Sequence, residues 1–147
     1  MKVLNAFSLS MLPPGAERSV FVKRVSCGEA RGAVLDDGFV ESYVGHADVA
    51  LVFTNELCLG VPANRANAVL VPGERALVGQ YTGPRLPEGT RCLPEGARIE
   101  WMIVSSPPRN SAECVAYAAW LKAHGAETRI RWAETHPVWI GAPRFDV

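Results

Sequence analysis

Excess charge of either sign is absent from this sequence of 147 residues, in which 15 lysines and arginines balance 15 aspartates and glutamates. Proteins that bind long nucleic acids non-specifically usually carry a strong basic excess, because the release of counterions drives that binding. We therefore expect no long nucleic acid as a partner. An anionic ligand of this chain is expected to be small and to be contacted by a local cluster of arginines.

Long apolar runs and paired cysteines are also missing. No stretch reaches the roughly 20 apolar residues that a membrane-spanning helix needs, and the start of the chain lacks the pattern of a secretory signal peptide. The four cysteines stand far apart without a CxxC pair, which argues against a zinc site and against a secreted disulfide framework. These absences predict a cytoplasmic protein with reduced thiols, no membrane association and no metal site.

Common catalytic motifs are missing as well. The sequence has no Walker loop, no GxSxG and no HExxH motif, and it contains three histidines. No cofactor is expected. His124 and His136 lie near the C-terminal end, where His124 can satisfy the terminal carbonyls of a predicted helix. His46 is the histidine whose surroundings point to a functional site.

The residues that are present predict an α/β fold. The apolar fraction of 48% and the charged fraction of 20% are those of a globular domain large enough to bury a core. Apolar spacing predicts a helix from Ala47 to Leu59, capped by Gly60, and the segment Cys27–Gly38 fits either a turn of helix or a plain turn. The predicted strands are Lys2–Leu12, Arg18–Val25, Asn67–Val71, Arg75–Tyr81 and Arg98–Val104, the third and fourth forming a β-hairpin around Pro72-Gly73-Glu74. We expect a single domain with a mixed β-sheet flanked by helices.

The C-terminal third has a different organisation. A connector rich in proline and serine, Ser105–Ser111, precedes a predicted helix from Ala112 to His124 that Ser111 can cap and Gly125 ends. A last predicted strand, Glu127–Glu134, and a proline-rich tail follow. We therefore divide the chain into an α/β core, residues 1–104, and an α-β C-terminal extension of the same domain, residues 105–147.

His46 stands in "YVGHADVALVF", directly before the predicted helix. Gly45 allows a tight backbone turn there, so His46 is expected at the helix N-terminus, where free amides and the helix dipole favour a bound anion. An imidazole can donate a proton near neutral pH, which suits protonation of an alkoxide leaving group. The alternative is a histidine that caps the helix or packs against Phe53.

Two polar loops offer candidate binding residues. In "TGPRLPEG", Arg85 and Glu88 stand three residues apart in a loop stiffened by prolines, so they can clamp a phosphate and orient a proton donor. The commoner alternative is a surface salt bridge in a turn. In "PANRAN", Asn64 and Arg65 either reach a base edge or phosphate or are ordinary polar loop residues.

The first predicted strand carries a third group of polar residues. Open α/β sheets bind ligands at the ends of their strands. Asn5, Ser8 and Ser10 are therefore candidate ligand contacts, although each taken singly is more often an ordinary strand or turn residue.

Four of these segments together resemble one family. "LNAFSLSML", "ESYVGHADVA", "PANRANAVLVPGERALV" and "RLPEG" follow one another in an order and spacing similar to the small viral and bacterial ring nucleases known as type III anti-CRISPR proteins. Members of that family destroy cyclic tetra-adenylate, the second messenger of type III CRISPR complexes. The resemblance covers roughly residues 2 to 104, and the extension lies outside it.

The resemblance implies a role for each candidate residue. The family's histidine after a glycine, here Gly45 and His46, is its general acid, and the Arg-x-x-Glu-Gly loop places Arg85 as a binding residue with Glu88 assisting the histidine. The other implied substrate contacts are Asn5, Ser8, Gly45, Asn64 and Arg65, and also Ser10, where some members have asparagine.

The resemblance further implies a metal-independent reaction in a homodimer. The 2′-hydroxyl of RNA is an internal nucleophile, so cleavage can proceed without a metal if the site aligns it and protonates the 5′-oxygen. The expected product is linear di-adenylate with a 2′,3′-cyclic phosphate. A two-fold ligand suits a two-fold dimer with the ligand cavity at its interface, each subunit supplying one His46 and one Arg85. A protein that binds the ring and barely cuts it is the alternative.

Overall fold

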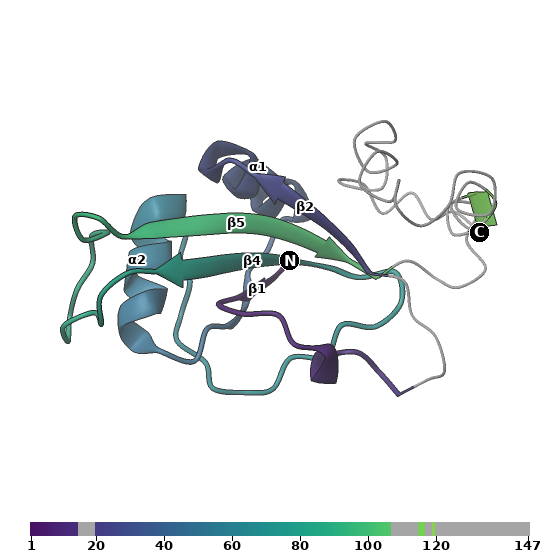
Figure 1. Cartoon of the computed structure of the whole chain (residues 1–147), viewed down its shortest axis with the longest axis horizontal. Helices are drawn as coiled ribbons and strands as arrows, with labels where there is room; N and C mark the ends of the chain where they lie inside the picture. The colour runs from purple at the N-terminus through teal and green to yellow at the C-terminus, as the bar shows by residue number, and fades with distance from the viewer. Residues whose placement is uncertain (15–19, 107–114, 117–118, 120–147) are drawn as a thin grey trace.

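The protein is built on a five-stranded mixed sheet. The computed structural model describes residues 1–14 and 20–106, together with positions 115, 116 and 119. In these residues the strand order is β2-β5-β4-β1-β3 (Figure 1). The strands are β1 (Lys2–Leu4), β2 (Phe21–Val25), β3 (Glu41–Tyr43), β4 (Arg75–Thr82) and β5 (Arg98–Ser105). The helices are α1 (Cys27–Asp37) and α2 (Ala47–Leu57), with a 3-10 turn, η1 (Leu9–Met11). The predicted α/β fold with a mixed sheet is thereby confirmed.

The strand directions bring three strand ends to one edge of the sheet. β1 pairs in parallel with both β3 and β4, whereas β5 is antiparallel to β4 and to β2. The carboxyl ends of β1, β3 and β4 therefore lie at the same edge. Asn5, the segment from Val44 to His46 and the loop after Thr82 all begin there, which is the edge where open α/β sheets place their ligands.

The two faces of the sheet are covered differently. One buried cluster joins the sheet to both helices, with Ala30 and Val34 from α1 and Phe53 and Leu57 from α2. The other face is covered by coil and by the η1 region. Residues of this region pack on a second buried cluster, which consists of Leu4, Ala68, Leu70, Ala76, Val78 and Val104. The expectation of a sheet flanked by helices is thus correct for one face only.

The predicted hairpin between Asn67–Val71 and Arg75–Tyr81 is wrong. Both edges of β4 are taken, by β1 and by β5, so no position remains for a strand at 67–71. That segment instead crosses the second face of the sheet, where the Leu70 amide donates to the Met11 carbonyl at 2.8 Å. Ala68 and Leu70 are buried against the sheet, whereas Val69 and Val71 are exposed, so the segment covers the sheet rather than extends it.

Strand β1 is shorter than predicted, and strand β3 is an addition to the predicted strands. The strand predicted from Lys2 to Leu12 ends at Leu4, and the chain bends at Asn5 before η1. The short strand β3 was not predicted. Three residues at a sheet edge carry too little alternation to stand out in a sequence.

Both helices also differ from their predicted bounds. α1 is a full helix of 11 residues that begins with a capping box, in which Ser26 and Glu29 each accept from the other's backbone amide. The Ser-x-x-Glu spacing in the sequence is the signal for this helix start. α2 ends at Leu57 rather than Leu59, because Cys58 adopts the left-handed conformation (φ 51°) expected of Gly60 as the cap.

The predicted C-terminal helix and strand lie outside the described residues, apart from positions 115, 116 and 119. The strand predicted for Arg18–Val25 is confirmed from Phe21 onward, and the strand predicted for Arg98–Val104 is confirmed with one more residue, Ser105. Among the described residues, no helix has both the length and the apolar character required to cross a bilayer.

Candidate functional site

His46 lies at the N-terminus of α2, as the sequence predicts. It is the N-cap residue in extended conformation (φ −107°, ψ 123°), and its side chain makes no capping hydrogen bond. The side chain is exposed, whereas Phe53 is fully buried and packs on Trp101 in the core. His46 therefore occupies the N-cap position without capping the helix through its side chain, and the buried ring of Phe53 packs on Trp101. The imidazole is free to meet a ligand.

A cavity of about 830 Å³ opens beside this helix end. Its lining comes from the first turn of α2, from the loop before β4 and from the end of β4 with the loop that follows. The lining residues are His46, Ala47, Asp48, Val49, Arg65, Tyr81, Arg85, Leu86, Pro87 and Glu88. The structure thus brings together four of the predicted site residues from positions up to 42 apart in the chain, namely His46, Arg65, Arg85 and Glu88.

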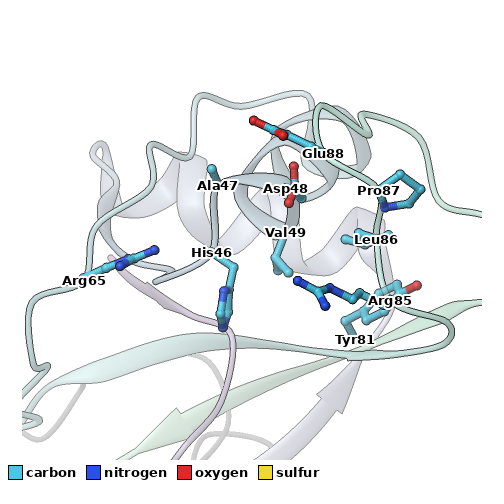
Figure 2. A pocket seen from close by; sticks show the side chains of 10 residues that line it. All are labelled: His46, Ala47, Asp48, Val49, Arg65, Tyr81, Arg85, Leu86, Pro87 and Glu88. Atoms are coloured by element: carbon cyan, nitrogen blue, oxygen red, sulfur yellow. The ribbon is translucent and has the colours of Figure 1, made fainter.

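Arg65 is held in place by the end of β3. Its Nε donates to the Gly45 carbonyl at 3.3 Å. The loop that carries it is tied to the same strand end by a bridge between Val44 and Ala63 and by the Asn64 amide, which donates to the Val44 carbonyl at 2.8 Å. Figure 2 shows the guanidinium pointing from this loop toward the start of α2. Gly45 does not adopt the left-handed conformation, so the turn before α2 does not require glycine there. Gly45 contributes to the site through its carbonyl, which accepts from Arg65.

Arg85 approaches His46 from the opposite side (Figure 2). It lies near the start of the loop between β4 and β5, where the Tyr81 hydroxyl donates to the Pro84 carbonyl at 2.7 Å. Two arginines on either side of an exposed imidazole form a local positive cluster. Such guanidinium groups bind phosphate oxygens, with geometry that favours paired hydrogen bonds.

The loop contains two copies of one turn. The Leu-Pro-Glu-Gly sequence occurs at Leu86–Gly89 and again at Leu93–Gly96. In each copy the glycine is left-handed (φ 79° and 76°), and the next residue's amide donates to the proline carbonyl, at 3.1 and 3.0 Å. These hydrogen bonds define turns at Pro87–Thr90 and Pro94–Ala97, each with glycine at the third position, where a left-handed residue is required. The first copy lines the cavity through Leu86, Pro87 and Glu88, and the second does not.

Glu88 lines the cavity at a distance from the imidazole in the view of Figure 2. Asp48 lies between the Glu88 and His46 side chains in this view. No hydrogen bond links Glu88 to His46 among the described residues. The predicted assistance of the histidine by Glu88 stays a prediction.

Asn64 does not line the cavity, and both ends of its side-chain amide are engaged by the backbone. Its Nδ2 donates to the Ser42 carbonyl at 2.8 Å, and its Oδ1 accepts from the Ala66 amide at 3.0 Å. Its evident role is to shape the loop that carries Arg65.

Asn5, Ser8 and Ser10 also lie outside the cavity lining. Asn5 follows β1 at the edge where the cavity opens, and Ser8 and Ser10 join hydroxyls at 2.9 Å in η1, where Ser8 is the N-cap. The contacts predicted for these three residues with a ligand stay predictions.

Two polar residues of the cavity lining, Asp48 and Tyr81, were not among the residues predicted from the sequence. Asp48 accepts from the Gly89 amide at 2.8 Å and so joins α2 to the loop of Arg85. Tyr81 lies near the carboxyl end of β4. The rule that ligands bind at carboxyl ends of strands could have pointed to Tyr81, whereas the partner of Asp48 is 41 residues away and leaves no local signal.

The cavity combines cationic and acidic side chains. Arg65, Arg85 and His46 line it together with two carboxylates, Asp48 and Glu88. Arginines and helix amides suit an anion, and an exposed imidazole suits proton transfer. Within the described ranges, no three His, Cys, Asp or Glu side chains are grouped as a metal site would require.

Comparisons with known proteins give a family and a fold. A family model described as STIV B116-like matches residues 1–95. The solved structure of B116 of Sulfolobus turreted icosahedral virus is similar, with a TM-score of 0.58 and 21% sequence identity over 71% of this chain and 97% of that one. At this identity the likeness establishes the fold alone. No curated protein matches the chain.

Proposed function

The chain belongs to the STIV B116-like family, and from that premise and the cavity around His46 we propose that it is a ring nuclease for cyclic tetra-adenylate. It would cleave the messenger to linear di-adenylate and so switch off type III CRISPR signalling, either for a virus against its host or for a host ending its own signal. The substrate comes from the resemblance of the four sequence motifs to ring nucleases. The chemistry is supported by the geometry of the site.

The observation that carries the proposal is the position of His46. An exposed imidazole without a capping hydrogen bond stands at the start of α2, between Arg65 and Arg85, in one cavity. The two guanidinium groups and the first amides of α2 can hold a phosphate diester. The imidazole then lies where it can reach an oxygen of that phosphate. A general acid so placed contributes about 10²- to 10⁴-fold to the rate.

The reaction balances with the atoms of the substrate and one proton from the histidine. The 2′-hydroxyl oxygen forms a bond to the neighbouring phosphorus as its proton passes to solvent water, and the bond from phosphorus to the 5′-oxygen breaks. The imidazolium of His46 protonates that departing oxygen. Each cut yields one 2′,3′-cyclic phosphate end and one 5′-hydroxyl end, and two cuts at opposite linkages convert the ring into two linear di-adenylates. No metal or cofactor takes part in this step.

A dimer fits the size of the cavity. Small-molecule sites measure about 300 to 1,000 Å³, and a cavity of about 830 Å³ holds part of a ring of four nucleotides rather than all of it. Two copies facing each other across a two-fold axis would enclose a two-fold ring and supply one His46 and one Arg85 to each half. Light scattering with and without cyclic tetra-adenylate tests this assembly.

A cyclic-nucleotide sponge is the second candidate, and the position of Glu88 favours it. Because Glu88 and His46 lie at opposite ends of the cavity lining with Asp48 between them (Figure 2), the proposed assistance requires the loop to move when the ring binds. If the loop does not move, the cavity binds the ring and cuts it slowly. A misplacement of about 1 Å can cost about 100-fold in rate.

The experiment is digestion of cyclic tetra-adenylate in excess EDTA, with products resolved by chromatography and mass. The wild-type protein is expected to yield linear di-adenylate with a cyclic phosphate end, and His46→Ala to leave the ring intact but bound. An intact ring that co-elutes with the wild-type protein would identify a sponge. A ring that is neither bound nor cut would contradict the assignment of this substrate.

A further inference from the structure

The loop between β4 and β5 meets the start of α2 through one strong polar contact. The Gly89 amide donates to Asp48 Oδ1 at 2.8 Å, a bond between residues 41 apart. Within the described residues, the other hydrogen bonds of the first part of this loop are internal to it or link it to the strand before it, as with Tyr81 to Pro84 and Thr90 to Pro87. The contact therefore ties the segment that carries Arg85 and Glu88 to the helix turn that follows His46.

We propose that Asp48 is a positioning residue for the site. Its carboxylate, acting through the Gly89 amide, sets the placement of Arg85 and Glu88 relative to His46. This inference rests on the proposed function for its effect on turnover, but the contact itself can be measured without any substrate.

The charge of Asp48 makes this role informative. A carboxylate is favoured in the first turn of a helix because it faces the positive end of the helix dipole. In a cavity built for a phosphate, however, a carboxylate repels the ligand. Asp48 lines the cavity beside two arginines, and its bond to Gly89 gives this acidic side chain a function that offsets the repulsion. In Figure 2 Asp48 lies between the loop that carries Glu88 and the turn that carries His46.

Gly89 supplies the complementary half of the contact. It is the left-handed third residue (φ 79°) of the Pro87–Thr90 turn, and its amide donates to Asp48. A residue with a side chain adopts this conformation only at a cost. The position of the amide is therefore fixed by the same turn that presents Glu88 to the cavity.

Two substitutions separate the hydrogen bond from the charge. Asp48→Ala removes the hydrogen-bond acceptor. Because alanine has a high helix propensity, α2 is expected to remain folded. Asp48→Asn keeps an oxygen acceptor and removes the charge. Asp36→Ala, an exposed aspartate in the last turn of α1, changes the net charge in the same way at a remote position.

Asp48→Ala is expected to lower the turnover rate of cyclic tetra-adenylate about 10- to 100-fold, because the loop residues lose their alignment with the imidazole. Asp48→Asn stays within about threefold of the wild-type protein, since the amide retains its acceptor. Asp36→Ala is unchanged. Equal loss in Asp48→Asn and Asp48→Ala would overturn the proposal, because the charge and not the hydrogen bond would then matter. Wild-type turnover in Asp48→Ala would overturn it as well.

A second measurement follows the Gly89 amide by hydrogen exchange in NMR spectra of the full-length protein. Gly89 is exposed, so its amide should exchange slowly only because Asp48 holds it. We expect exchange to speed up at least about tenfold in Asp48→Ala and to change little in Asp48→Asn. Equally fast exchange in the wild-type protein and Asp48→Ala would overturn the proposal. If the wild-type protein neither binds nor cuts the ring, the proposed function fails while this exchange still decides whether Asp48 holds the loop.

Discussion

At the scale of single residues, Glu88 and Glu95 occupy the same position in two copies of one turn, and only Glu88 lines the cavity. We predict that Glu88→Ala lowers cleavage of cyclic tetra-adenylate by at least about tenfold, because a carboxylate that orients the acid is lost. Glu95→Ala is the matched control, with the same neighbours in sequence and the same loss of charge. Initial rates of cleavage for both variants check this prediction. Equal rates would show that Glu88 has no role in cleavage.

Gly79 is a second residue whose role can be tested directly. A Cβ added there would come within 2.5 Å of Phe53 Cζ and of Trp101 Cζ3, whose rings meet at a centroid distance of 4.8 Å. Gly79→Ala is therefore predicted to lower the free energy of unfolding by about 1–3 kcal/mol through overpacking. Gly28→Ala, in α1 with no atom near the added Cβ, should instead raise it by about 0.5–1 kcal/mol. Urea titrations of the two variants check both signs.

Asp37 links three parts of the fold by charge. It forms ion pairs with the Met1 amine and with Arg75. Burial raises the pKa of Asp37, but the hydrogen bonds from these two cations outweigh it and hold the pKa below its usual value. A carboxyl with a depressed folded-state pKa stabilises the protein above its unfolded pKa, about 3.9, and loses that contribution as the pH falls further.

The matching prediction concerns stability against pH. Asp37→Asn should be less stable than the wild-type protein at pH 7 by about 1 kcal/mol or more. The difference in unfolding free energy between the two proteins should narrow as the pH falls below about 4, because the wild-type carboxyl then becomes protonated and loses its charge. Thermal melts at several pH values measure it, with Asp36→Asn as the control. A gap that stays constant down to pH 2 would contradict this account of Asp37.

At the scale of elements, α1 depends on its capping box. Ser26 Oγ accepts from the Glu29 amide at 3.2 Å, and Glu29 Oε2 accepts from the Ser26 amide at 2.7 Å. The hydrogen bonds from the Ser26 backbone and side chain lower the pKa of Glu29. Ser26→Ala is predicted to cost about 1 kcal/mol of unfolding free energy. Denaturant midpoints measure the loss, and Ser26→Thr, which keeps the cap, should recover most of it.

Local patterns predicted the elements whose causes are local. The apolar spacing after His46 located α2, and alternation located β2 and β5. The hairpin prediction failed because the partners of β4 are chosen by the whole sheet, not by the Pro-Gly turn beside it. In the site, the start of α2 and the Arg85 loop were visible in the sequence. The Asp48 to Gly89 bond and the two faces of the sheet were not, because each joins segments far apart in the chain.

At the scale of the whole molecule, the described sheet, both buried clusters and the cavity lie within residues 1–106. Ser106 is buried, and its amide donates to the Glu74 carbonyl at 3.1 Å. A chain ending after Ser106 is therefore predicted to fold with the same sheet and to retain ring cleavage. Circular dichroism and cleavage assays check this. An insoluble or unfolded product would show that residues 107–147 are part of the core.

In the proposed reaction His46 is the acid for the departing 5′-oxygen, and a ring with a leaving group that needs no proton tests that role. In cyclic tetra-adenylate that carries sulfur in place of a bridging 5′-oxygen, the leaving group is a thiolate that needs no proton. We predict that His46→Ala, slow on the natural ring by about 10²- to 10⁴-fold, cleaves the sulfur-bridged ring nearly as fast as the wild-type protein does, whereas Arg85→Ala stays slow on both. If His46→Ala is equally slow on both rings, His46 is not the general acid and the account is wrong.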